Sequence, residues 1–524
     1  MNKKNIFIAT LCLASATLFS SCKSSQPAQT VKEKSLVVLF DNDVHCNLEG
    51  YAKMAGLRDA IADTADVIVV SCGDFLQGGR ASTLSKGKYI VDVMKKVNYD
   101  VITLGNHEFD FGAEHMMNLL KELNAPITCV NFKEHRSGKT LYAPYIIKNY
   151  GQQKIAFIGV TTPTAITSER YAFFDDKNQQ IYDMSEREIY PLVQKTVDEV
   201  RTQGANFVII LSHLGEEPTE YNEDSNGLIA NTTGIDVLFD GHTHAVIEKK
   251  AIANKSGQPV IVSQTGTKFA NIGKLTLLPN KKTTIEHIPT EKLTDNAMVK
   301  QVIDSINGLT DKYLNTLVGT CDFGINITGE DGKRAVRNSE TNAGDIIADA
   351  FRILTGANIG MTDGGSVRAD IKAGEIRIKD ILDVLPYDNL IYELEVDGKQ
   401  IETTLNACIQ KLPLEDGEFP QVSGLTFTLN INQGENKVSD LKVLNPKSGN
   451  YEPIDYNKKY TIATIDYIAV GGGMYNTLQG CKIVRKDIMV DKDALIEYIS
   501  KNMNGHVGQE YAKPQGRIKV NGTR

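Results

Sequence analysis

The stretch TLGNHEFDFG, Thr103–Gly112, follows directly on the apolar residues Val101 and Ile102. A buried strand here opens at once into an asparagine, a histidine and two carboxylates. A turn needs only one asparagine or glycine to redirect the chain. The additional polar groups therefore predict a functional site at the end of this strand.

Four further apolar runs also end on Asp or His, and they lie at residues 36–40, 67–70, 207–211 and 237–239. The polar groups after the five runs are Asp43, His45, Asp74, Asn106, His213, His242 and His244. If the runs are neighbouring parallel strands, their carboxyl ends meet at the edge where α/β sheets bind ligands. So many buried polar groups need a positive partner, and their number predicts two divalent metal ions.

Two pairs of these groups are separated by a single residue: Asp43 with His45, and His242 with His244. On extended chain, side chains two residues apart point to the same face, so each pair is expected to contribute to one cluster. A single histidine after a strand is usually structural. The prediction depends on the conjunction, because five of the nine histidines directly follow apolar runs.

The pattern of the chain indicates two domains. From about residue 36 to 278, short apolar runs alternate with helical stretches, which predicts an α/β domain whose sheet is covered by helices. Residues 298–317 have a helical pattern without strands beside them and predict a connecting helix. Beyond Gly319, a helix at 343–354 followed by alternating strand patterns predicts an α+β domain.

Composition narrows the class of ligand. The 524 residues carry a net charge of −8, with 41% hydrophobic and 23% charged residues, as in ordinary globular proteins. Surfaces that bind nucleic acid polymers are basic, so this charge argues against such a partner. A small phosphorylated substrate needs only local positive charge or metal and remains compatible with the sequence.

The N-terminus predicts export. Lys3 and Lys4 precede an apolar segment at 6–19 that is too short to span a bilayer as a mature helix. Small residues directly before Cys22 resemble a bacterial lipoprotein signal at 1–22, and a plain signal peptide with an incidental cysteine is the alternative. Residues 23–34 would be a polar tether, and a lipid on Cys22 would hold the protein at a membrane. We therefore expect a periplasmic or cell-envelope lipoprotein of a bacterium.

The segments NDVH (42–45), GD (73–74), GNHEFDFG (105–112), SHLG (212–215) and GHTH (241–244) together resemble the calcineurin-like metallophosphoesterases. More narrowly, they are similar to the 5′-nucleotidase and UDP-sugar hydrolase family, in order and over nearly all of the mature chain. The resemblance implies an α/β fold with a four-layer αββα metallophosphoesterase sandwich at 35–290. A connecting helix at 291–318 and a C-terminal α+β substrate-binding domain at 319–524 would follow, and in the family the two domains rotate about that helix.

The resemblance also implies ligand roles. The implied ligands are Asp43, His45 and His244 for one ion, Asn106, His213 and His242 for the other, and Asp74 as a bridge between them. Several relatives carry Gln or Asn in place of His244. An imidazole there favours zinc or manganese over magnesium.

By the same resemblance, His107 and Asp110 would be the catalytic pair. Two metal ions polarise the phosphate and lower the pKa of a bound water. His107 would offer an N–H to the charge that grows on the reacting oxygens, and Asp110 would orient its imidazole. Glu108 is expected to face away. Relatives that act on 2′,3′-cyclic nucleotides tend to carry Asn at position 110, so Asp110 favours monoester and pyrophosphate substrates.

The second domain would recognise the part of the substrate that does not react. The implied residues are Arg337 and Arg368 for phosphate oxygens, Asn389 and Gly417 for the base, and Tyr387 and Tyr467 in place of two phenylalanines that sandwich the base. The family has a GGDG sequence whose Asp contacts the ribose. Here Gly473 stands in its place, which puts nucleoside specificity in doubt.

The sequence thus predicts an exported dimetal phosphohydrolase that releases phosphate from nucleotides, with UDP-sugars or ATP as further substrates. One alternative is a related metallophosphoesterase with a non-nucleotide or cyclic-nucleotide substrate. The other is a non-catalytic nucleotide-binding surface protein. The native metal, the preferred base and the oligomeric state are left open.

Overall fold

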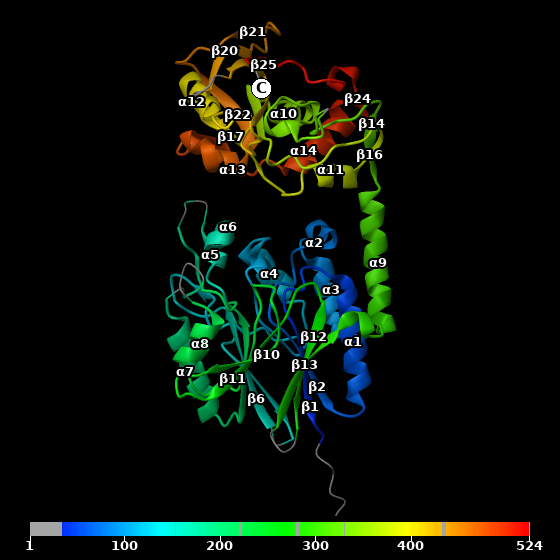
Figure 1. Ribbon diagram of the computed structural model, residues 1–524, viewed down its shortest axis with the longest axis vertical. Helices are drawn as coiled ribbons and strands as arrows, with labels where there is room; N and C mark the ends of the chain where they lie inside the picture. The colour runs from blue at the N-terminus through cyan, green and yellow to red at the C-terminus, as the bar shows by residue number, and fades with distance from the viewer. Residues whose placement is uncertain are drawn as a thin grey trace, which may run out of the picture. The chain divides into compact units, whose positions relative to one another are not determined.

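The computed structural model describes residues 34–522 except 152, 176, 178, 186, 219–222, 279–281, 330 and 432–435. The chain divides into two compact units, which we call the N-terminal unit (1–304) and the C-terminal unit (305–524) and describe separately (Figure 1). The predicted signal peptide, with Cys22, and nearly all of the tether lie outside the described residues. In the part of the chain that the structure describes, no helix is long and apolar enough to cross a membrane.

The N-terminal unit contains two large mixed sheets. The strand order of the first is β13-β12-β1-β2-β3, and that of the second is β10-β11-β9-β8-β6-β5. The first sheet comprises β1 (Leu36–Asp41), β2 (Asp66–Ser71), β3 (Val101–Ile102), β12 (Asn271–Leu277) and β13 (Thr283–Pro289). The second comprises β5 (Ile146–Tyr150), β6 (Gln153–Thr161), β8 (Phe207–His213), β9 (Val237–Phe239), β10 (Val246–Ala253) and β11 (Pro259–Thr265).

The five apolar runs that end in polar groups are divided between these sheets. β1, β2 and β3 pair in parallel in the first sheet, and β8 and β9 pair in parallel in the second. The expectation that all five are neighbours in one sheet is therefore wrong. The local patterns were correct, but an apolar run does not specify which sheet it joins.

The two sheets pack against each other through alternate residues of their strands. Phe40 of β1 and Phe239 of β9 belong to one buried core, and their rings stack 3.8 Å apart. On β6, Phe157 belongs to this core, whereas its neighbour Ile158 belongs to the core under α7 (Ile189–Thr202). Because successive side chains of a strand point to opposite faces, each sheet has two buried faces. This arrangement confirms the predicted four-layer sandwich.

Helices form the outer layers of the sandwich. α1 (Leu48–Ala62) and α3 (Lys88–Val97) cover one side, and α7 and α8 (Ser225–Asn231) cover the other (Figure 1). Shorter elements of this unit are α2 (Arg80–Ser85), α4 (Ala113–Leu120), α5 (Ala165–Ser168), α6 (Arg170–Phe173), β4 (Lys133–Glu134), β7 (Tyr182–Asp183) and the 3₁₀ turn η1 (His107–Phe109). The helical stretches expected between the apolar runs are confirmed, with α1, α3 and α4 as examples.

The predicted connecting helix corresponds to α9 (Ala297–Leu314). Its first turn is capped by Asn296, whose side chain accepts a hydrogen bond from the Val299 N–H at 3.0 Å. The boundary between the two units, after Asp304, falls inside this helix. The predicted domain limits, at residues 290 and 318, stay predictions.

The C-terminal unit is α+β, as predicted. Its strands are β14 (Leu317–Cys321), β15 (Ile359–Asp363), β16 (Gly374–Arg377), β17 (Ile391–Asp397), β18 (Pro420–Ser423), β19 (Leu425–Asn430), β20 (Lys437–Leu444), β21 (Tyr451–Pro453), β22 (Lys459–Ile465), β23 (Lys482–Arg485), β24 (His506–Val507) and β25 (Ile518–Asn521). They form sheets ordered β18-β15-β22-β17-β23, β16-β14-β24 and β21-β20-β19-β25.

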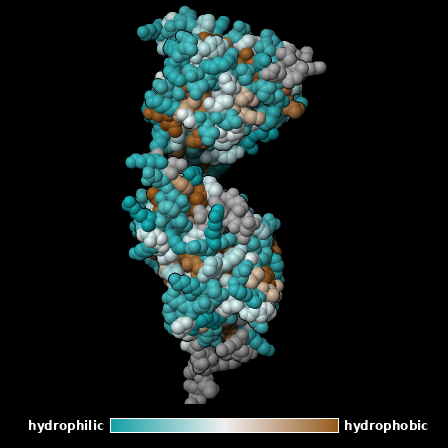
Figure 2. Space-filling model, turned by 90° about the vertical axis from the view of Figure 1, so that its left-hand side faces the viewer, coloured by the Kyte–Doolittle hydropathy of each residue, from teal (hydrophilic) through white to brown (hydrophobic). Residues whose placement is uncertain are grey.

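The helices of this unit pack on those sheets. They are α10 (Asn342–Thr355), α11 (Ile378–Val384), α12 (Gly398–Cys408), α13 (Asp466–Ala469) and α14 (Asp491–Glu497). Phe351 of α10 and Leu394 of β17 are fully buried in their common core. On the face shown in Figure 2, hydrophilic residues predominate in both units, and hydrophobic residues are exposed in small groups.

Candidate active site

The predicted metal ligands lie in loops at the carboxyl ends of strands from both sheets. Asp43 and His45 follow β1, Asp74 follows β2, and Asn106 follows β3. In the second sheet, His213 is the last residue of β8, and the loop after β9 carries His242 and His244. The distances between their side chains show that these loops meet at one edge of the sandwich, which we call the ligand edge.

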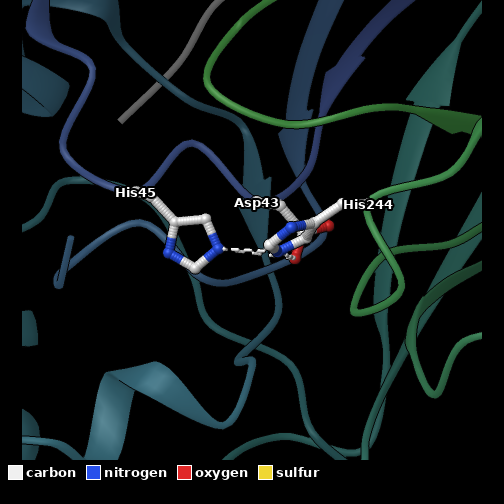
Figure 3. Close-up of side chains that lie close together, drawn as sticks. All are labelled: Asp43, His45 and His244. Atoms are coloured by element: carbon white, nitrogen blue, oxygen red, sulfur yellow. Dashed lines mark hydrogen bonds and ion pairs between the residues drawn. The ribbon is translucent and has the colours of Figure 1, made fainter.

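The first group of ligands comprises Asp43, His45 and His244 (Figure 3). The Nε2 atoms of His45 and His244 lie 2.9 Å apart. His244 Nε2 is 3.3 Å from Asp43 Oδ1, and His45 Nε2 is 3.9 Å from the same oxygen. Two imidazoles and a carboxylate thus point at a common centre.

The second group comprises Asp43, Asp74 and His213, all buried. His213 Nε2 lies 3.0 Å from Asp74 Oδ2 and 3.8 Å from Asp43 Oδ1. Beside this group, Asn106 Oδ1 lies 3.0 Å from His242 Nδ1. All seven predicted ligands are therefore brought to the ligand edge.

Asp74, a member of the second group, also approaches the first. Its Oδ2 atom is 3.9 Å from His45 Nε2 on one side and 3.0 Å from His213 Nε2 on the other. Its Oδ1 atom accepts a hydrogen bond from the backbone N–H of His107 at 2.9 Å. The same carboxylate thus touches both ligand groups and the turn that carries the predicted catalytic histidine.

His107 and Asp110 form a side-chain pair beside these ligands. Both carboxylate oxygens of Asp110 lie 3.1 Å from His107 Nδ1. The His107 ring packs edge-on against the His45 ring, with centroids 5.3 Å apart. Burial lowers the pKa of His107, but the hydrogen bond with Asp110 and the charges of Asp74 and Asp110 raise it to about 9. The imidazole is thus held as a proton-bearing group next to a ligand.

In the C-terminal unit, four of the predicted substrate residues lie close together. The Gly365 N–H donates to the Gly417 carbonyl at 2.6 Å, and Arg368 Nη1 donates to the Gly365 carbonyl at 3.2 Å. The Arg368 guanidinium lies 5.8 Å from the centre of the exposed Tyr387 ring. Arg337 also lies near Gly417, and its buried Nε lacks a hydrogen-bond partner among the described residues.

Asn389 and Tyr467 complete the predicted set. The Asn389 amide donates to the buried carboxyl group of Asp491 at 2.9 Å. Burial raises the pKa of Asp491 to about 7. Tyr467 is 44% exposed, so its ring has an open face.

Each of the two units contains a region that matches a known protein family. Residues 36–246 match the calcineurin-like phosphoesterases, and residues 318–480 match the 5′-nucleotidase C-terminal domain. The chain belongs to the 5′-nucleotidase family of calcineurin-like phosphoesterases. The family prediction is confirmed, and the chain has groups of candidate metal ligands in its phosphoesterase region.

The chain is similar to several named proteins. It is 28% identical to the trifunctional nucleotide phosphoesterase protein YfkN of Bacillus subtilis, over 92% of this chain and 35% of that protein. It is 24% identical to the snake venom 5′-nucleotidase of Naja atra, over 92% of this chain and 98% of that protein. The chain therefore spans about a third of YfkN and nearly all of the venom enzyme.

The crystal structure of a 5′-nucleotidase precursor from Thermus thermophilus has the same fold. The TM-score is 0.55, the identity is 24%, and the match covers 94% of this chain and all of the other.

The residues of the ligand edge fit divalent metal ions. His213 is fully buried, and its Nδ1 donates to the Cys72 carbonyl at 2.6 Å, which leaves the Nε2 lone pair free. No described residue makes a hydrogen bond of good geometry with this Nε2 atom. A buried imidazole lone pair that faces two carboxylates needs a positive partner. Carboxylate, imidazole and amide donors suit ions such as zinc or manganese.

The backbone of the ligand edge is unusual. Left-handed φ angles occur at Asp43 (+50°), His45 (+44°), Asp74 (+58°), His242 (+79°) and His244 (+58°). Non-glycine residues seldom adopt this conformation, and they cluster at functional sites. The expectation that the paired ligands share a face of extended chain is therefore wrong. They converge because tight left-handed turns aim their side chains inward.

Glu108 is a functional residue whose role the sequence reasoning missed. It is fully buried rather than facing away, and its carboxyl group accepts backbone N–H groups from Asp74, Phe75, Leu76 and Gly105 at 2.6–3.1 Å. Gly105 allows this close approach, because a Cβ atom there would lie 2.1 Å from Asp74 Oδ1. Glu108 thus ties the turn of His107 to the loop of Asp74. The one signal for this role in the sequence was the position of Glu108, directly after His107 in the polar stretch that follows β3.

Glu418 was also missed, and it fills the space in front of Gly473. A Cβ atom at position 473 would lie 1.7 Å from Glu418 Oε1 and 2.8 Å from the Tyr467 hydroxyl oxygen. The Met474 N–H donates to Glu418 Oε2 at 2.6 Å and holds the carboxylate there. The expected Asp is thus absent, but a carboxylate from another segment stands beside Tyr467.

Proposed function

We propose that this phosphoesterase is an exported 5′-nucleotidase that uses two divalent metal ions to release phosphate from nucleoside 5′-monophosphates. UDP-sugars and ATP are further substrates of the same chemistry. The observation that carries the proposal is the convergence of two ligand groups on Asp43 and Asp74, directly beside the His107–Asp110 pair.

The proposed assignment of ligands follows the family resemblance, and the first of its two sets is the first group seen in the structure. One ion would be held by Asp43, His45 and His244, the other by Asn106, His213 and His242, and Asp74 would serve both. The position of Asp74, with one oxygen near both His45 and His213, supports the bridging role. The contact of His242 with Asn106 supports placing these two on the same ion.

In phosphoryl transfer, the protein mainly positions the substrate and stabilises charge, and it forms few covalent bonds itself. When bound at the ligand edge, two divalent ions would supply polarisation of the phosphate and a nucleophilic water near neutral pH. His107 donates its Nε2–H to the charge that develops on the phosphoryl and leaving oxygens. Asp110 accepts from His107 Nδ1 and so keeps the imidazole protonated and turned toward the ligands.

In the proposal, the C-terminal unit recognises the nucleoside. Tyr387 and Tyr467 offer exposed rings on which a base stacks. The unpartnered Nε of Arg337 and the guanidinium of Arg368 suit phosphate oxygens, while Asn389 and Gly417 contact the base. The Glu418 carboxylate accepts hydrogen bonds from sugar hydroxyls, in place of the Asp that Gly473 replaces.

A second candidate is a related phosphoesterase with a non-nucleotide or cyclic-nucleotide substrate. The observation that favours it is Gly473, which removes an expected sugar contact. Two observations favour the nucleotidase instead. Glu418 supplies a carboxylate at the same place, and Asp110 is typical of relatives that act on monoesters and pyrophosphates.

Phosphate release from a panel of substrates tests the proposal. The panel comprises AMP, UDP-glucose, ATP, a 2′,3′-cyclic nucleotide, glucose 6-phosphate, glycerol phosphate and p-nitrophenyl phosphate, each with added Mn²⁺ or Zn²⁺. We expect the highest kcat/KM for AMP. A higher value for the cyclic nucleotide or for a sugar phosphate would replace the proposal with the second candidate. The inactive control is Asp74→Ala, which removes the bridge.

We further propose that the protein is a lipoprotein of the bacterial envelope, anchored through Cys22. The polar stretch at 23–34, after an apolar segment and a cysteine, supports this. Fractionation of cells that express the chain or its Cys22→Ala variant tests it. The parent protein should sediment with membranes and extract into detergent, whereas the variant should not. Equal distribution of both forms would argue for a plain signal peptide.

A further inference from the structure

The segment that contains α5 and α6 packs directly on the turn that carries His107 and Asp110. Phe173 of α6 and Phe109 of η1 are both fully buried, and their ring centroids are 4.9 Å apart. The Tyr171 hydroxyl donates to the carbonyls of Phe109, at 3.4 Å, and Asp110. The position of this segment relative to the His107–Asp110 pair is thus determined by core packing and by backbone hydrogen bonds.

Glu169 joins α5 to α6 and faces that pair. Only 9% of its surface is exposed. One carboxyl oxygen of Glu169, one of Asp110 and a ring nitrogen of His107 all lie within 4.8 Å of one another. The Glu169 carboxyl oxygen is thus close enough to Asp110 for a small movement of either side chain to join them by a hydrogen bond. Asp110 therefore has both His107 and Glu169 as close neighbours.

We propose that Glu169 is a positioning residue of the phosphoesterase: its carboxyl group donates a hydrogen bond to Asp110 and holds the Asp110 carboxylate against the His107 imidazole. The inference rests on the role proposed for His107. Neither the family sequence segments nor the ligand set assigns a role to Glu169.

The chemistry of two adjacent carboxyl groups determines which one donates. Two carboxylates cannot hydrogen-bond to each other unless one of them carries a proton. Burial and the charge of Asp110 raise the pKa of Glu169 to about 7, which supports Glu169 as the protonated partner. Asp110 then keeps its negative charge for the imidazole. A neutral donor behind it restricts its rotation without competing for that charge.

Three variants of the full-length, metal-loaded enzyme test the proposal, with p-nitrophenyl phosphate as substrate. Glu169→Ala removes the donor, Glu169→Gln keeps a neutral N–H donor of similar size, and Glu188→Ala is the matched control on an exposed position. We expect Glu169→Ala to lower kcat about ten- to a hundredfold, the cost of a poorly placed catalytic group. KM, metal content and Tm should change little. Glu169→Gln should recover most of the activity, and Glu188→Ala should match the parent.

A double-variant cycle separates positioning from a general structural effect. In an Asp110→Asn background, Glu169→Ala should have almost no further effect on kcat, because its action passes through Asp110. If the separate effects of Glu169→Ala and Asp110→Asn on kcat multiply in the double variant, the proposal is overturned. So would parent-like kcat in Glu169→Ala, failure of the well-folded Glu169→Gln enzyme to recover activity, or loss of one metal ion per chain, which would make this cluster a metal site.

The outcome is distinguishable from a failure of the proposed function. The aryl phosphate needs no recognition of a nucleoside, so the cycle remains informative if AMP is not hydrolysed. Conversely, an enzyme that prefers AMP but is insensitive to Glu169 would remove only this inference.

Discussion

The ligand edge of the N-terminal unit and the exposed residues Tyr387 and Tyr467 of the C-terminal unit are built in opposite ways. At the ligand edge, Asp43, Asp74 and His213 are at most 1% exposed, and two of them have left-handed backbone. In the C-terminal unit, Tyr387 is 56% exposed and Tyr467 44%. Metal ligands must be held within about half an ångström by their surroundings, whereas stacking on a ring tolerates many sequences and poses. We therefore expect substitutions at the first region to abolish turnover and those at the second to adjust it.

The largest effect is expected for Asp74→Ala, because it removes the bridge between the two ligand groups. The variant should lose bound metal on dialysis, and kcat should fall at least about a thousandfold, as when a charge-stabilising group is removed from an active site. Elemental analysis and phosphate release measure both. Exposed Asp63→Ala is the control and should retain both. Full metal content in Asp74→Ala would contradict the expectation that substitutions at the ligand edge have the largest effects.

His107→Ala should separate catalysis from metal binding at the ligand edge itself. The variant loses the N–H that faces the reacting oxygens, and kcat should fall by about 10²–10⁴, the usual contribution of a positioned acid or base. Metal content should remain that of the parent, because His107 is a neighbour of the ligands and not one of them. If the metal is lost as well, His107 belongs among the ligands.

Tyr467→Ala should act mainly on substrate affinity. Loss of one stacked base costs about 1–3 kcal/mol, so KM for AMP should rise roughly 5- to 150-fold with little change in kcat. Tyr467→Phe keeps the ring face and should raise KM much less. Glycerol phosphate, which has no ring to stack, should show a far smaller change in steady-state kinetics. A fall in kcat as large as that of His107→Ala would contradict the distinction between the two regions.

The smallest effect is expected at Glu418. Glu418→Gln keeps the size of the side chain but removes its charge, and the lost hydrogen-bond strength of about 1 kcal/mol should lower the preference for AMP over 2′-deoxy-AMP roughly fivefold. Gly473→Asp in a Glu418→Gly background returns a carboxylate to the same space and should restore the preference. Asp tolerates the left-handed φ of +54° at that position. An unchanged preference in Glu418→Gln would leave sugar recognition to another group.

Several features were predictable from local sequence. The apolar runs of β1, β2, β8 and β9 are short and bounded by polar residues, so the strands and the polar groups after them could be identified without tertiary information. Family resemblance then supplied the four-layer architecture. The bottom-up expectation of one sheet failed because strand pairing depends on contacts between residues far apart in the chain.

The functional residues that were missed have a common physical cause. Glu108 acts by accepting N–H groups from a loop more than thirty residues earlier. Glu169 and Glu418 each meet their partners from a distant segment, at Asp110 and in front of Gly473. An isolated glutamate in a polar stretch has the same local pattern whether it is solvated or buried against a catalytic pair.

The sequence by itself determined the candidate chemistry: which strands end in predicted metal ligands, and which histidine and aspartate stand next to them. Only the tertiary structure decided the geometry. It brings loops from two sheets to one edge, and it places Glu108, Glu169 and Glu418 against segments that are distant in the sequence. Hydrophobic periodicity acts over a few residues and can be read along the chain. Side-chain convergence is set by packing between distant segments, which no local pattern specifies.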